Sequence, residues 1–375
     1  MEKMRKERNK EDEARPLFGL QSMGGLLLSW YDRCRRILPW REDPQPYHVW
    51  LSEIMLQQTR VEAVKEYYSR FLRELPTIRD LAAAPEDKLL KLWEGLGYYN
   101  RVRNLQKAAQ IVMEQHGGAL PADYDALLKL PGVGAYTAGA IASISFGLPV
   151  PAVDGNVLRV FARILNDGRD VTRPDVKKDL TARVMELQPP ERPGDYNQAL
   201  MELGAIGVPA GRRAPVQRMS LARAVCGPRP GRAGDTARKG AARCKKNAAL
   251  DRGAGAGYGK PARPAAAAPA EGASAGLWQP VLLEGARSAI QTEQALAALG
   301  VTARAVEPLT PARHVFSHLV WEMDGFACAA QSCAPPPGCV WAGRAEVDGV
   351  YTLPGAFKAY RPVLKNTCKP AGKRI

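Results

Sequence analysis

The run LPGVGAYTAGAI at residues 130–141 constrains the fold more than any other part of the sequence. Helical patterns flank the turn PGVG, so one helix should end at Leu130 and the next should begin near Ala135. Because glycine has no Cβ, Gly132 and Gly134 let the backbone approach a ligand closely. Their amide groups then point outward at a helix N-terminus, where an anion is favoured. The run predicts a helix-hairpin-helix, which can hold a DNA phosphate without reading sequence.

Hydrophobic periodicity divides the chain into a long helical part and a smaller mixed part. In residues 23–206 apolar residues recur at helical spacing, and Pro and Gly separate the patterns. From about residue 276 the sequence predicts a helix at EQALAALG and strands at FSHLVWEMDGFACAA and CVWAGRAEV. A charged N-terminal tail, residues 1–22, and a C-terminal tail, residues 366–375, flank these two parts.

The segment between them, residues 207–275, has an unusual composition. It holds 14 Lys and Arg against 3 Asp and Glu, and so contributes +11 to a net charge of +15. The positive charge of the whole chain is therefore weak evidence for a polyanionic partner. The segment is rich in Ala, Gly, Arg and Pro and has a single aromatic residue, Tyr258. We expect a disordered basic linker without a core of its own.

We expect that the protein is neither secreted nor inserted into a membrane. Its first residues are charged and lack an apolar core, and no apolar run approaches the ~20 residues that span a bilayer. Seven scattered cysteines, an odd number, fit a reducing cytosol. We therefore expect a cytoplasmic protein that associates with the nucleoid through DNA and has no membrane partner.

Five further motifs accompany the hairpin and the VDGN run that contains Asp154. They are LPWR (38–41), PYHVWLSEIMLQQTRV (46–61), GLGYYNRVRNL (95–105), NQALMELGA (197–205) and HVFSH (314–318). In this order and spacing the chain resembles the MutY-type adenine DNA glycosylases. These belong to the helix-hairpin-helix glycosylase superfamily, which also contains endonuclease III. The resemblance covers residues 23–206 almost without a break and resumes from about 276 to 365.

The resemblance implies both a fold and an activity. The fold would be mainly α, with a two-lobed helix-hairpin-helix glycosylase domain at 23–206 and a smaller α+β, Nudix-like domain at 276–365. The activity would be base-excision repair by a DNA N-glycosylase, a hydrolase that removes adenine mispaired with 8-oxoguanine or guanine. Double-stranded DNA with such a mispair would be the partner of a monomeric enzyme that needs no nucleotide cofactor.

Two carboxylates suit cleavage of an N-glycosidic bond, which needs an acid for the leaving base and negative charge near the sugar cation. Glu53 stands among apolar residues on a helix, where burial would raise its pKa toward the range of a general acid. By resemblance Glu53 protonates the flipped adenine, and Asp154 stabilises, or transiently captures, the sugar cation. Asp154 also precedes a helix, where Asp is a favoured N-cap, so it can serve both purposes.

The resemblance also assigns residues that bind the adenine and the DNA. The adenine pocket would contain Trp40, Arg41, Leu56 and Glu202. DNA contacts would come from Gln57, Gln58, Thr59, Tyr98, Gly132, Gly134 and Asn156, with Gln58 and Tyr98 wedged into the duplex. The triplet Phe316, Ser317 and His318 would check 8-oxoguanine on the opposite strand. The Glu-rich box that binds metal in Nudix hydrolases is absent from the chain, so this domain should recognise the lesion and hydrolyse nothing.

Position 136 decides the reaction type. In the lyase branch, which resembles endonuclease III, a Lys at this position forms a Schiff base and nicks the strand. Here the residue is Tyr136, which cannot form one, so we predict a monofunctional glycosylase in which Tyr136 belongs to the catalytic group. Two alternatives stay open: a bifunctional glycosylase/lyase for oxidised pyrimidines, and a DNA-binding remnant without catalysis.

Most relatives in the family carry a 4Fe–4S cluster on C-x6-C-x2-C-x5-C directly after the NQALMELGA helix. In register its ligands would be Val208, Pro215, Arg218 and Ala224, so all four thiolates that such a cluster needs are missing. The length up to the next family landmark, Leu277 and Trp278, is nevertheless kept. We interpret residues 207–275 as GC-rich DNA translated in a shifted reading frame, which would have replaced the cluster loop and the first strands of the next domain.

Overall fold

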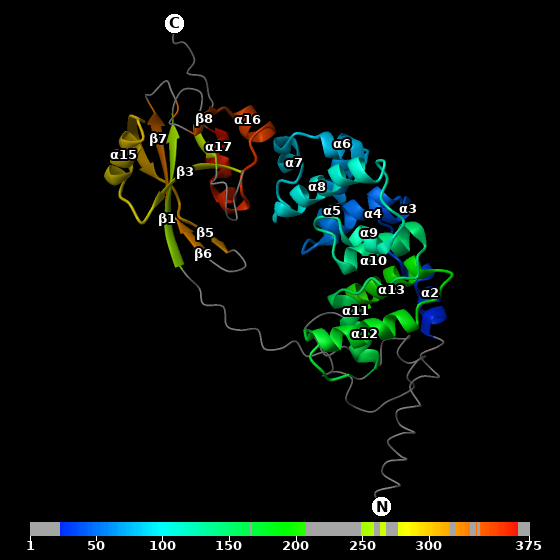
Figure 1. Cartoon of the computed structure of the whole chain (residues 1–375). Coiled ribbons are helices and arrows are strands. Elements are labelled where there is room, and N and C mark those ends of the chain that lie inside the picture. Colours follow the sequence, from blue (N-terminus) through cyan, green and yellow to red (C-terminus); the bar gives the residue numbers. More distant parts are fainter. Residues whose placement is uncertain are drawn as a thin grey trace, which may run out of the picture. The chain divides into compact units, whose positions relative to one another are not determined.

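The computed structural model describes residues 23–165, 167–207, 249–258, 263–267, 277–315, 320–330, 335 and 338–366. These residues form two compact units (Figure 1). The helical unit contains residues up to Ala83 and from Asn104 through the last described residue before the gap, Gly207. The sheet unit contains residues 84–103 and the described residues from Ala249 onward.

The described part of the chain up to Gly207 is entirely helical between its loops, as its apolar periodicity predicts. The helices are α2 (Met23–Cys34), α3 (Pro39–Glu42), α4 (Pro46–Leu56), α5 (Val61–Glu74), α6 (Ile78–Ala83), α7 (Glu86–Leu92), α8 (Asn100–Gln115), α9 (Tyr124–Leu128), α10 (Ala135–Phe146), α11 (Gly155–Ile164), α12 (Pro174–Glu186), α13 (Pro193–Glu202) and the π-helical turn η1 (Leu203–Gly207). Pro starts four of these helices at the first position, α3, α4, α12 and α13, where its missing N–H costs nothing.

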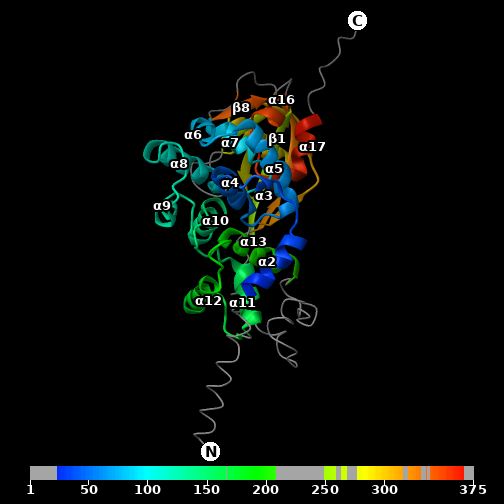
Figure 2. The same cartoon turned by 90° about the vertical axis from the view of Figure 1, so that its right-hand side faces the viewer.

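Helix α10 is the central element of the helical unit. Its residues from Thr137 to Ser143 are buried all round, as expected for a helix enclosed by others. Figures 1 and 2 both place α10 between α4 and α13, and it packs against each of them. A Cβ on Gly139 would lie 2.2 Å from the carbonyl oxygen of Pro151. Glycine at this position therefore lets the loop that leads to α11 pass directly over α10.

A second core joins α2 to α11, α12 and α13. Side chains of Leu27 and Tyr31 from α2 meet Phe161 of α11, Leu180 of α12 and Tyr196 of α13, all of them fully buried. This core fixes the start of α11, and hence Asp154, relative to the end of α13.

Among the described residues from Ala249 onward, the sheet unit has eight strands and several short helices. The elements are β1 (Ala249–Tyr258), β2 (Arg263–Ala267), β3 (Trp278–Glu284), α15 (Ala289–Ala298), β4 (Ala303–Pro308), β5 (Ala312–Val315), β6 (Val320–Met323), β7 (Gly325–Ala330), β8 (Cys339–Ala342), α16 (Arg344–Gly349), the 3-10 helix η3 (Gly355–Tyr360) and α17 (Arg361–Asn366). The strand order is β4-β7-β1-β3-β2-β8, and β6 pairs with both β1 and β5. Strand β1 runs parallel to β6 and β7 and antiparallel to β3.

The sheet packs against its helices through small apolar clusters. Leu296 of α15 lies with Val281, Val301 and Cys328, while Phe357 and Tyr360 of η3 lie with Trp321 and Met323. A mainly α fold with a small sheet-containing C-terminal region is thus confirmed. Its likeness to a Nudix domain stays a prediction from the resemblance.

Two expectations for the C-terminal half are wrong. Strands β1 and β2 lie inside the segment that was expected to be an unstructured linker. Strand pairing uses backbone N–H and C=O groups, so a segment poor in large apolar residues can still join a sheet. The expected strand at CVWAGRAEV stops at Ala342, because Oε2 of Glu346 accepts a 2.7 Å hydrogen bond from the Gly343 amide and starts α16 instead.

The boundary between the units also differs from the expected one, because residues 84–103 group with the sheet unit. Within this unit Glu94 accepts a hydrogen bond from the Leu353 amide at 3.1 Å and forms an ion pair with Arg361 at 2.9 Å. Lys91 donates to the carbonyl oxygens of Val347 and Tyr351 at 3.1 and 3.2 Å. These polar contacts tie α7 and the loop after it to residues 347–361.

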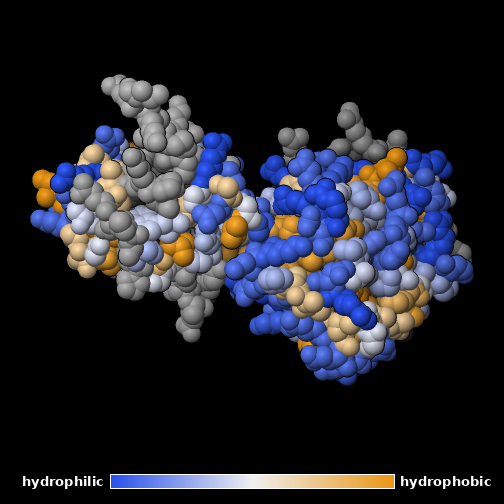
Figure 3. Space-filling view, turned by 90° about the horizontal axis from the view of Figure 1, so that it is seen from above, coloured by the Kyte–Doolittle hydropathy of each residue, from blue (hydrophilic) through white to orange (hydrophobic). Residues whose placement is uncertain are grey.

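The surface of the helical unit is largely polar. In the view of Figure 3 hydrophilic residues dominate its visible face, and apolar residues show only in separate patches, as is usual for globular proteins. Among the helices that the structure describes, none has the length and apolar character needed to cross a bilayer.

Candidate active site

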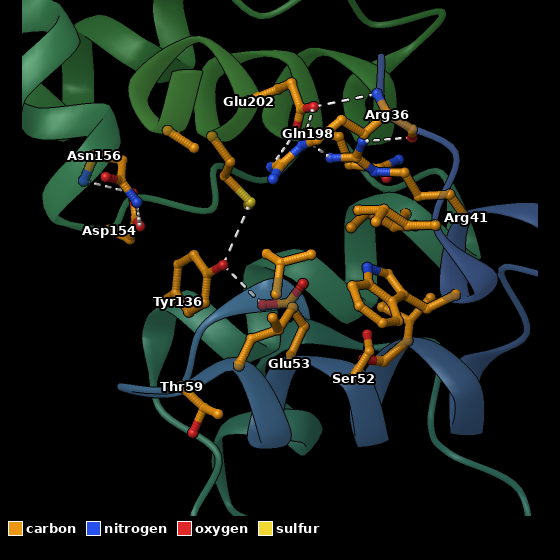
Figure 4. Close-up of a pocket in the computed structure, with 18 residues that line it drawn as sticks. Arg36, Arg41, Ser52, Glu53, Thr59, Tyr136, Asp154, Asn156, Gln198 and Glu202 are labelled. Atoms are coloured by element: carbon orange, nitrogen blue, oxygen red, sulfur yellow. Dashed lines mark hydrogen bonds and ion pairs between the residues drawn. The ribbon is translucent and has the colours of Figure 1, made fainter. Parts of the chain in front are cut away.

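A cavity of about 210 Å³ lies in the helical unit where α3, α4, α10, α11 and α13 meet. Figure 4 shows its lining, in which Glu53 and Tyr136 face each other and Asp154 lies to one side. The lining residues are Arg36, Leu38, Trp40, Arg41, Val49, Ser52, Glu53, Leu56, Thr59, Val61, Tyr136, Ile144, Asp154, Asn156, Gln198, Met201, Glu202 and Ala205. The cavity thus contains carboxylates, a phenol and guanidinium groups within one space.

Glu53 is positioned by α4, a helix whose residues from Val49 to Met55 are all buried. Its side chain is only 6% exposed, and Oε2 accepts a 2.7 Å hydrogen bond from the Tyr136 hydroxyl. Burial raises the pKa of Glu53 to about 7, although that hydrogen bond lowers it. The expected burial and raised pKa are therefore present, and the carboxyl group is poised to hold or release a proton near neutral pH.

Tyr136 stands at the second position of α10, directly after the hairpin turn. Its hydroxyl also lies 3.3 Å from Sδ of Met201. Burial raises the pKa of Tyr136 well above its ordinary value, and the nearby charge of Glu53 raises it further. The phenol is therefore neutral at physiological pH, and acts as a hydrogen-bond donor to Glu53.

Asp154 is the N-cap of α11, as expected. Its Oδ1 accepts hydrogen bonds from the amides of Asn156 at 2.8 Å and Val157 at 2.9 Å, and its Oδ2 accepts one from Nδ2 of Asn156 at 2.6 Å. The loop before it is held by Asn197, a fully buried residue of α13. Asn197 donates to the Val150 carbonyl oxygen at 2.9 Å and accepts from the Ala152 amide at 3.1 Å.

Asn156 connects the start of α11 to the π-helical turn after α13. Arg159 donates to Oδ1 of Asn156 and to the carbonyl oxygen of Gly204, both at 2.8 Å. A Cβ on Gly204 would lie 2.5 Å from Cβ of Asn156, so the two segments are in direct contact. π-Helical turns often occur at functional sites, and this one fixes the side chain that in turn fixes Asp154.

Glu202 ends α13 and is the most buried ionic group of the cavity, with a side chain only 1% exposed. Arg36 binds it through Nε at 2.7 Å and Nη2 at 2.8 Å, and Arg41 binds it through Nη2 at 2.9 Å. Burial raises its pKa, but the hydrogen bonds from the two arginines outweigh burial and hold the pKa at about 2. Glu202 is therefore ionised at neutral pH, whereas Glu53, with a pKa of about 7, is only partly ionised there.

One wall of the cavity is aromatic. Trp40 of α3 is 6% exposed, and its ring meets the ring of Tyr68 edge-on with centroids 5.4 Å apart. Such a contact fixes the plane of the indole ring. With Leu56 on the same cavity, Trp40 offers an apolar face on which a planar ligand could stack.

The predicted hairpin is formed by α9, the turn at residues 129–134 and α10. Gly132 has φ of +77°, and a Cβ there would lie 2.9 Å from Cβ of Asn104, so both conformation and space require glycine. Gly134 is the N-cap of α10 and has open space around the position of a Cβ. The N-terminus of α10 is thus accessible to an anion.

Comparison with known proteins shows which family the helical part resembles. Residues 51–186 match the HhH-GPD superfamily of base excision DNA repair proteins. The helical part of the chain therefore contains an HhH-GPD domain. It is 50% identical over 188 residues to the adenine DNA glycosylase of Rattus norvegicus, a match that covers 48% of this chain and 36% of the rat protein. The adenine DNA glycosylase of Homo sapiens is 49% identical over 190 residues, covering 48% of this chain and 35% of the human protein.

A solved structure supports the same fold for the HhH-GPD domain. The structure of a thermostable thymine-DNA glycosylase superposes with a TM-score of 0.51 at 27% identity, covering 56% of this chain and 96% of that chain. The matched part of the chain spans only about a third of the length of the rat and human relatives. The agreement therefore concerns the HhH-GPD domain.

The cavity brings together all of the predicted catalytic and adenine-pocket residues. These are Trp40, Arg41, Glu53, Leu56, Tyr136, Asp154 and Glu202, together with Thr59 and Asn156, which were expected to contact DNA. Gln57, Gln58, Gly132 and Gly134 do not line the cavity, and Tyr98 lies in the sheet unit. Phe316, Ser317 and His318 lie outside the described residues.

Nine lining residues were not among the predicted site residues, and Arg36, Gln198 and Met201 are three of them. Gln198 and Met201 lie with Glu202 and Ala205 on one face of the α13–η1 segment, and this i, i+3, i+4, i+7 spacing was visible in the NQALMELGA motif. Arg36 precedes LPWR by two residues. Its pairing with a residue 166 positions away has no local sequence signal.

The residues of this chain do not fit the iron–sulfur cluster that the superfamily implies. Val208, Pro215, Arg218 and Ala224 lie outside the described residues, and none of their side chains carries a thiolate. Within the described ranges no group of three or more His, Cys, Asp and Glu side chains could hold a metal ion.

Proposed function

We propose that this chain is a monofunctional adenine DNA glycosylase that hydrolyses the N-glycosidic bond of adenine paired with 8-oxoguanine or guanine in double-stranded DNA. One observation carries the proposal. A buried glutamate with a pKa of about 7 faces a neutral tyrosine, in a cavity that also contains an aspartate fixed by a helix N-terminus. An acid and a separate carboxylate are the two groups that glycosidic cleavage requires.

The proposed reaction begins with a base that leaves the stack and enters the cavity. Trp40 and Leu56 supply apolar surface for the ring, and the ionised Glu202 can accept a hydrogen bond from an exocyclic amine. Glu53 donates its proton to N7 of adenine. The C1′–N9 bond then breaks, its electron pair leaves with the base, and the sugar becomes an oxocarbenium ion.

Asp154 stabilises this cation through the charge of its carboxylate. The hydrogen bonds from two backbone amides and from Asn156 hold the carboxylate in place before the reaction starts, so little reorganisation is needed as charge develops. Glu53, now ionised, takes a proton from a water molecule whose oxygen adds to C1′. The products are free adenine and an abasic site, and Glu53 regains its proton.

Tyr136 makes the proposed enzyme monofunctional. Its phenol has no amine with which to form a Schiff base on the sugar, and its hydrogen bond to Glu53 gives it a different task. We infer that it orients the carboxyl group of Glu53 and moderates its pKa.

The DNA contacts in this proposal come from the hairpin and from two exposed loops. Gly132 and Gly134 would let a phosphate approach the N-terminus of α10. Gln58 and Tyr98, which would enter the duplex, have φ of +59° and +49°. Few non-glycine residues adopt such angles, and those that do concentrate at functional sites. Gln57, Thr59 and Asn156 would contact the flipped strand, and Phe316, Ser317 and His318 would check the opposite base.

The test uses a duplex with a single adenine opposite 8-oxoguanine, labelled on the adenine strand. We expect strand breaks only after treatment with hot alkali, which cleaves abasic sites. Breaks without alkali would identify a bifunctional lyase, and binding without base release would identify a DNA-binding remnant. Gel filtration of the protein with and without DNA should give a monomer. We propose that this monomer acts on DNA in the cytoplasm.

A further inference from the structure

The loop between α7 and α8 has an unusual backbone. Gly95, Gly97 and Tyr98 have φ of +106°, +70° and +49°, so three of four consecutive residues are left-handed. Glycine tolerates this region, whereas a bulky aromatic residue does so only when its surroundings impose it. Tyr98 is nevertheless 54% exposed. The contacts that hold its backbone must therefore come from residues on the buried side of the loop.

Arg101, in the first turn of α8, makes such contacts. Its Nη2 donates to the carbonyl oxygens of Leu96 at 3.0 Å and Gly97 at 3.1 Å. Its guanidinium carbon lies 5.3 Å from the ring centroid of the buried Trp93 and 5.8 Å from that of Tyr98. One side chain thus binds two loop carbonyls and two aromatic rings, at both ends of the loop.

Trp93 reinforces the same arrangement. Its Nε1 donates to the Gly97 carbonyl oxygen at 3.2 Å, so this carbonyl accepts from both Trp93 and Arg101. The Arg101 amide donates to the Tyr98 carbonyl oxygen at 2.9 Å. Burial lowers the pKa of Arg101 to about 10, so the guanidinium is still charged at neutral pH, and charged donors form the stronger hydrogen bonds.

We propose that Arg101 is a positioning residue, which holds the loop at residues 95–98 in the conformation that presents Tyr98 to the DNA base stack. This inference rests on the proposed function, in which Tyr98 enters the duplex. A planar, forked cation is needed, because an ammonium group cannot stack on two rings while it donates to two carbonyls. Without the contacts of Arg101, only a fraction of the molecules has the loop in this conformation. The apparent Kd for lesion DNA then rises by the inverse of that fraction.

The first measurement needs no DNA. Hydrogen exchange of the amides in the 94–100 segment should be faster in Arg101→Met and in Arg101→Lys than in the wild type. The matched control is Arg103→Met on the same helix, which removes one charge, an ion pair with Glu86 and a 3.5 Å hydrogen bond to Asn100 but leaves the bonds of Arg101 to Leu96 and Gly97 in place. Unchanged exchange in both Arg101 variants would overturn the proposal, and so would equal acceleration in the control.

The second measurement is binding to a duplex with a tetrahydrofuran abasic analogue opposite 8-oxoguanine. Arg101→Lys should raise Kd about tenfold, which corresponds to about 1.4 kcal/mol. The same substitution in the Tyr98→Ala background should have almost no further effect, because Arg101 acts through Tyr98. Additive effects of the two substitutions would overturn the proposal.

A salt titration excludes the simpler role of a phosphate contact. Loss of one such contact lowers the slope of log K against log salt by about 0.9. Loss of the contacts between Arg101 and the loop leaves the slope unchanged. A lower slope in Arg101→Met, together with normal binding by Arg101→Lys, would overturn the proposal. Faster exchange with unchanged DNA binding would show that Arg101 holds the loop but that Tyr98 does not enter the duplex. This outcome distinguishes failure of the proposed DNA contact from failure of the inference about Arg101.

Discussion

The hydroxyl of Tyr136 donates a 2.7 Å hydrogen bond to Oε2 of Glu53. The two residues come from different helices and are 83 positions apart in the sequence. The bond joins the helix-hairpin-helix, which can hold DNA, to the acid that can act on a base. Since Tyr136 follows the hairpin turn by two residues, a shift of the turn on DNA binding would be transmitted to Glu53.

Replacement of the acid should abolish catalysis and spare binding. We expect Glu53→Gln to lower the single-turnover rate of adenine release by at least about 100-fold, because general acid catalysis contributes that much or more. The amide keeps the size of the side chain, so the affinity for DNA should be retained. Glu62→Gln, in an exposed pair with Lys65, is the matched control. Release at the wild-type rate in Glu53→Gln would remove Glu53 from its proposed role.

The pH dependence should follow the pKa of Glu53. The group must be protonated to act as an acid, so the rate should be constant below about pH 7 and fall tenfold per unit above it. Tyr136→Phe removes a donor that stabilises the carboxylate, so the pKa should rise and the falling limb should move to higher pH. Single-turnover rates between about pH 5.5 and about pH 9 measure both profiles. Tyr124→Phe, a loss of hydroxyl on α9, should leave the limb in place, and a shift toward lower pH in Tyr136→Phe would contradict the assignment.

Two substitutions of Asp154 should separate its structural task from its catalytic one. Asparagine is as good an N-cap as aspartate, so Asp154→Asn should retain the stability of the wild type, while Asp154→Ala should lose about 1 kcal/mol. Both lose the charge that faces the sugar cation, so both should lower the rate by about 100-fold or more. Thermal unfolding and base release measured on the same samples test this. If Asp154→Asn released adenine at the wild-type rate and only Asp154→Ala were slower, Asp154 would act as a helix cap and not in catalysis.

The ion pairs of Glu202 should contribute to stability more than any exposed pair. In Glu202→Gln two guanidinium groups face a neutral amide, which should lower the free energy of unfolding by about 2 kcal/mol. This is less than the loss for a fully buried pair, because the Arg36 side chain is one-third exposed. Asp175→Asn, which breaks an exposed pair with Arg173, should leave the free energy unchanged. Urea denaturation at neutral pH gives both values. Equal stability of the two variants would mean that the ion pairs of Glu202 do not stabilise the fold and serve only to position Glu202 for ligand binding.

The local parts of the fold and of the site could be predicted from the sequence. The second hairpin helix begins at Ala135, Asp154 caps α11, and Glu53 is buried on an apolar helix with a raised pKa. Each of these follows from a few neighbouring residues: a glycine turn, an Asp before a helix, and a carboxylate within an apolar run.

Long-range relations could not be predicted in the same way. The pairs of Arg36 and Arg41 with Glu202 join residues more than 160 positions apart, and no periodicity records such a contact. For residues 249–267 the sequence predicted too little structure. Their Ala and Gly content indicated no secondary structure, but β1 and β2 lie there. Composition describes side chains, whereas strand pairing depends on backbone groups and on the neighbouring strands.

The coding DNA should contain a cysteine pattern that the protein sequence lacks. If residues 207–275 come from a shifted frame, translation of codons 200 to 290 in the other frames should give C-x6-C-x2-C-x5-C soon after the codon for Gly207. The reason is that the length up to Leu277 and Trp278 is kept although the composition changes abruptly. A fresh sequence read of this region decides the matter. A read without the insertion or deletion predicts a cellular enzyme that binds iron, measurable by its visible absorbance, whereas the absence of the cysteines from all frames would refute the shifted frame.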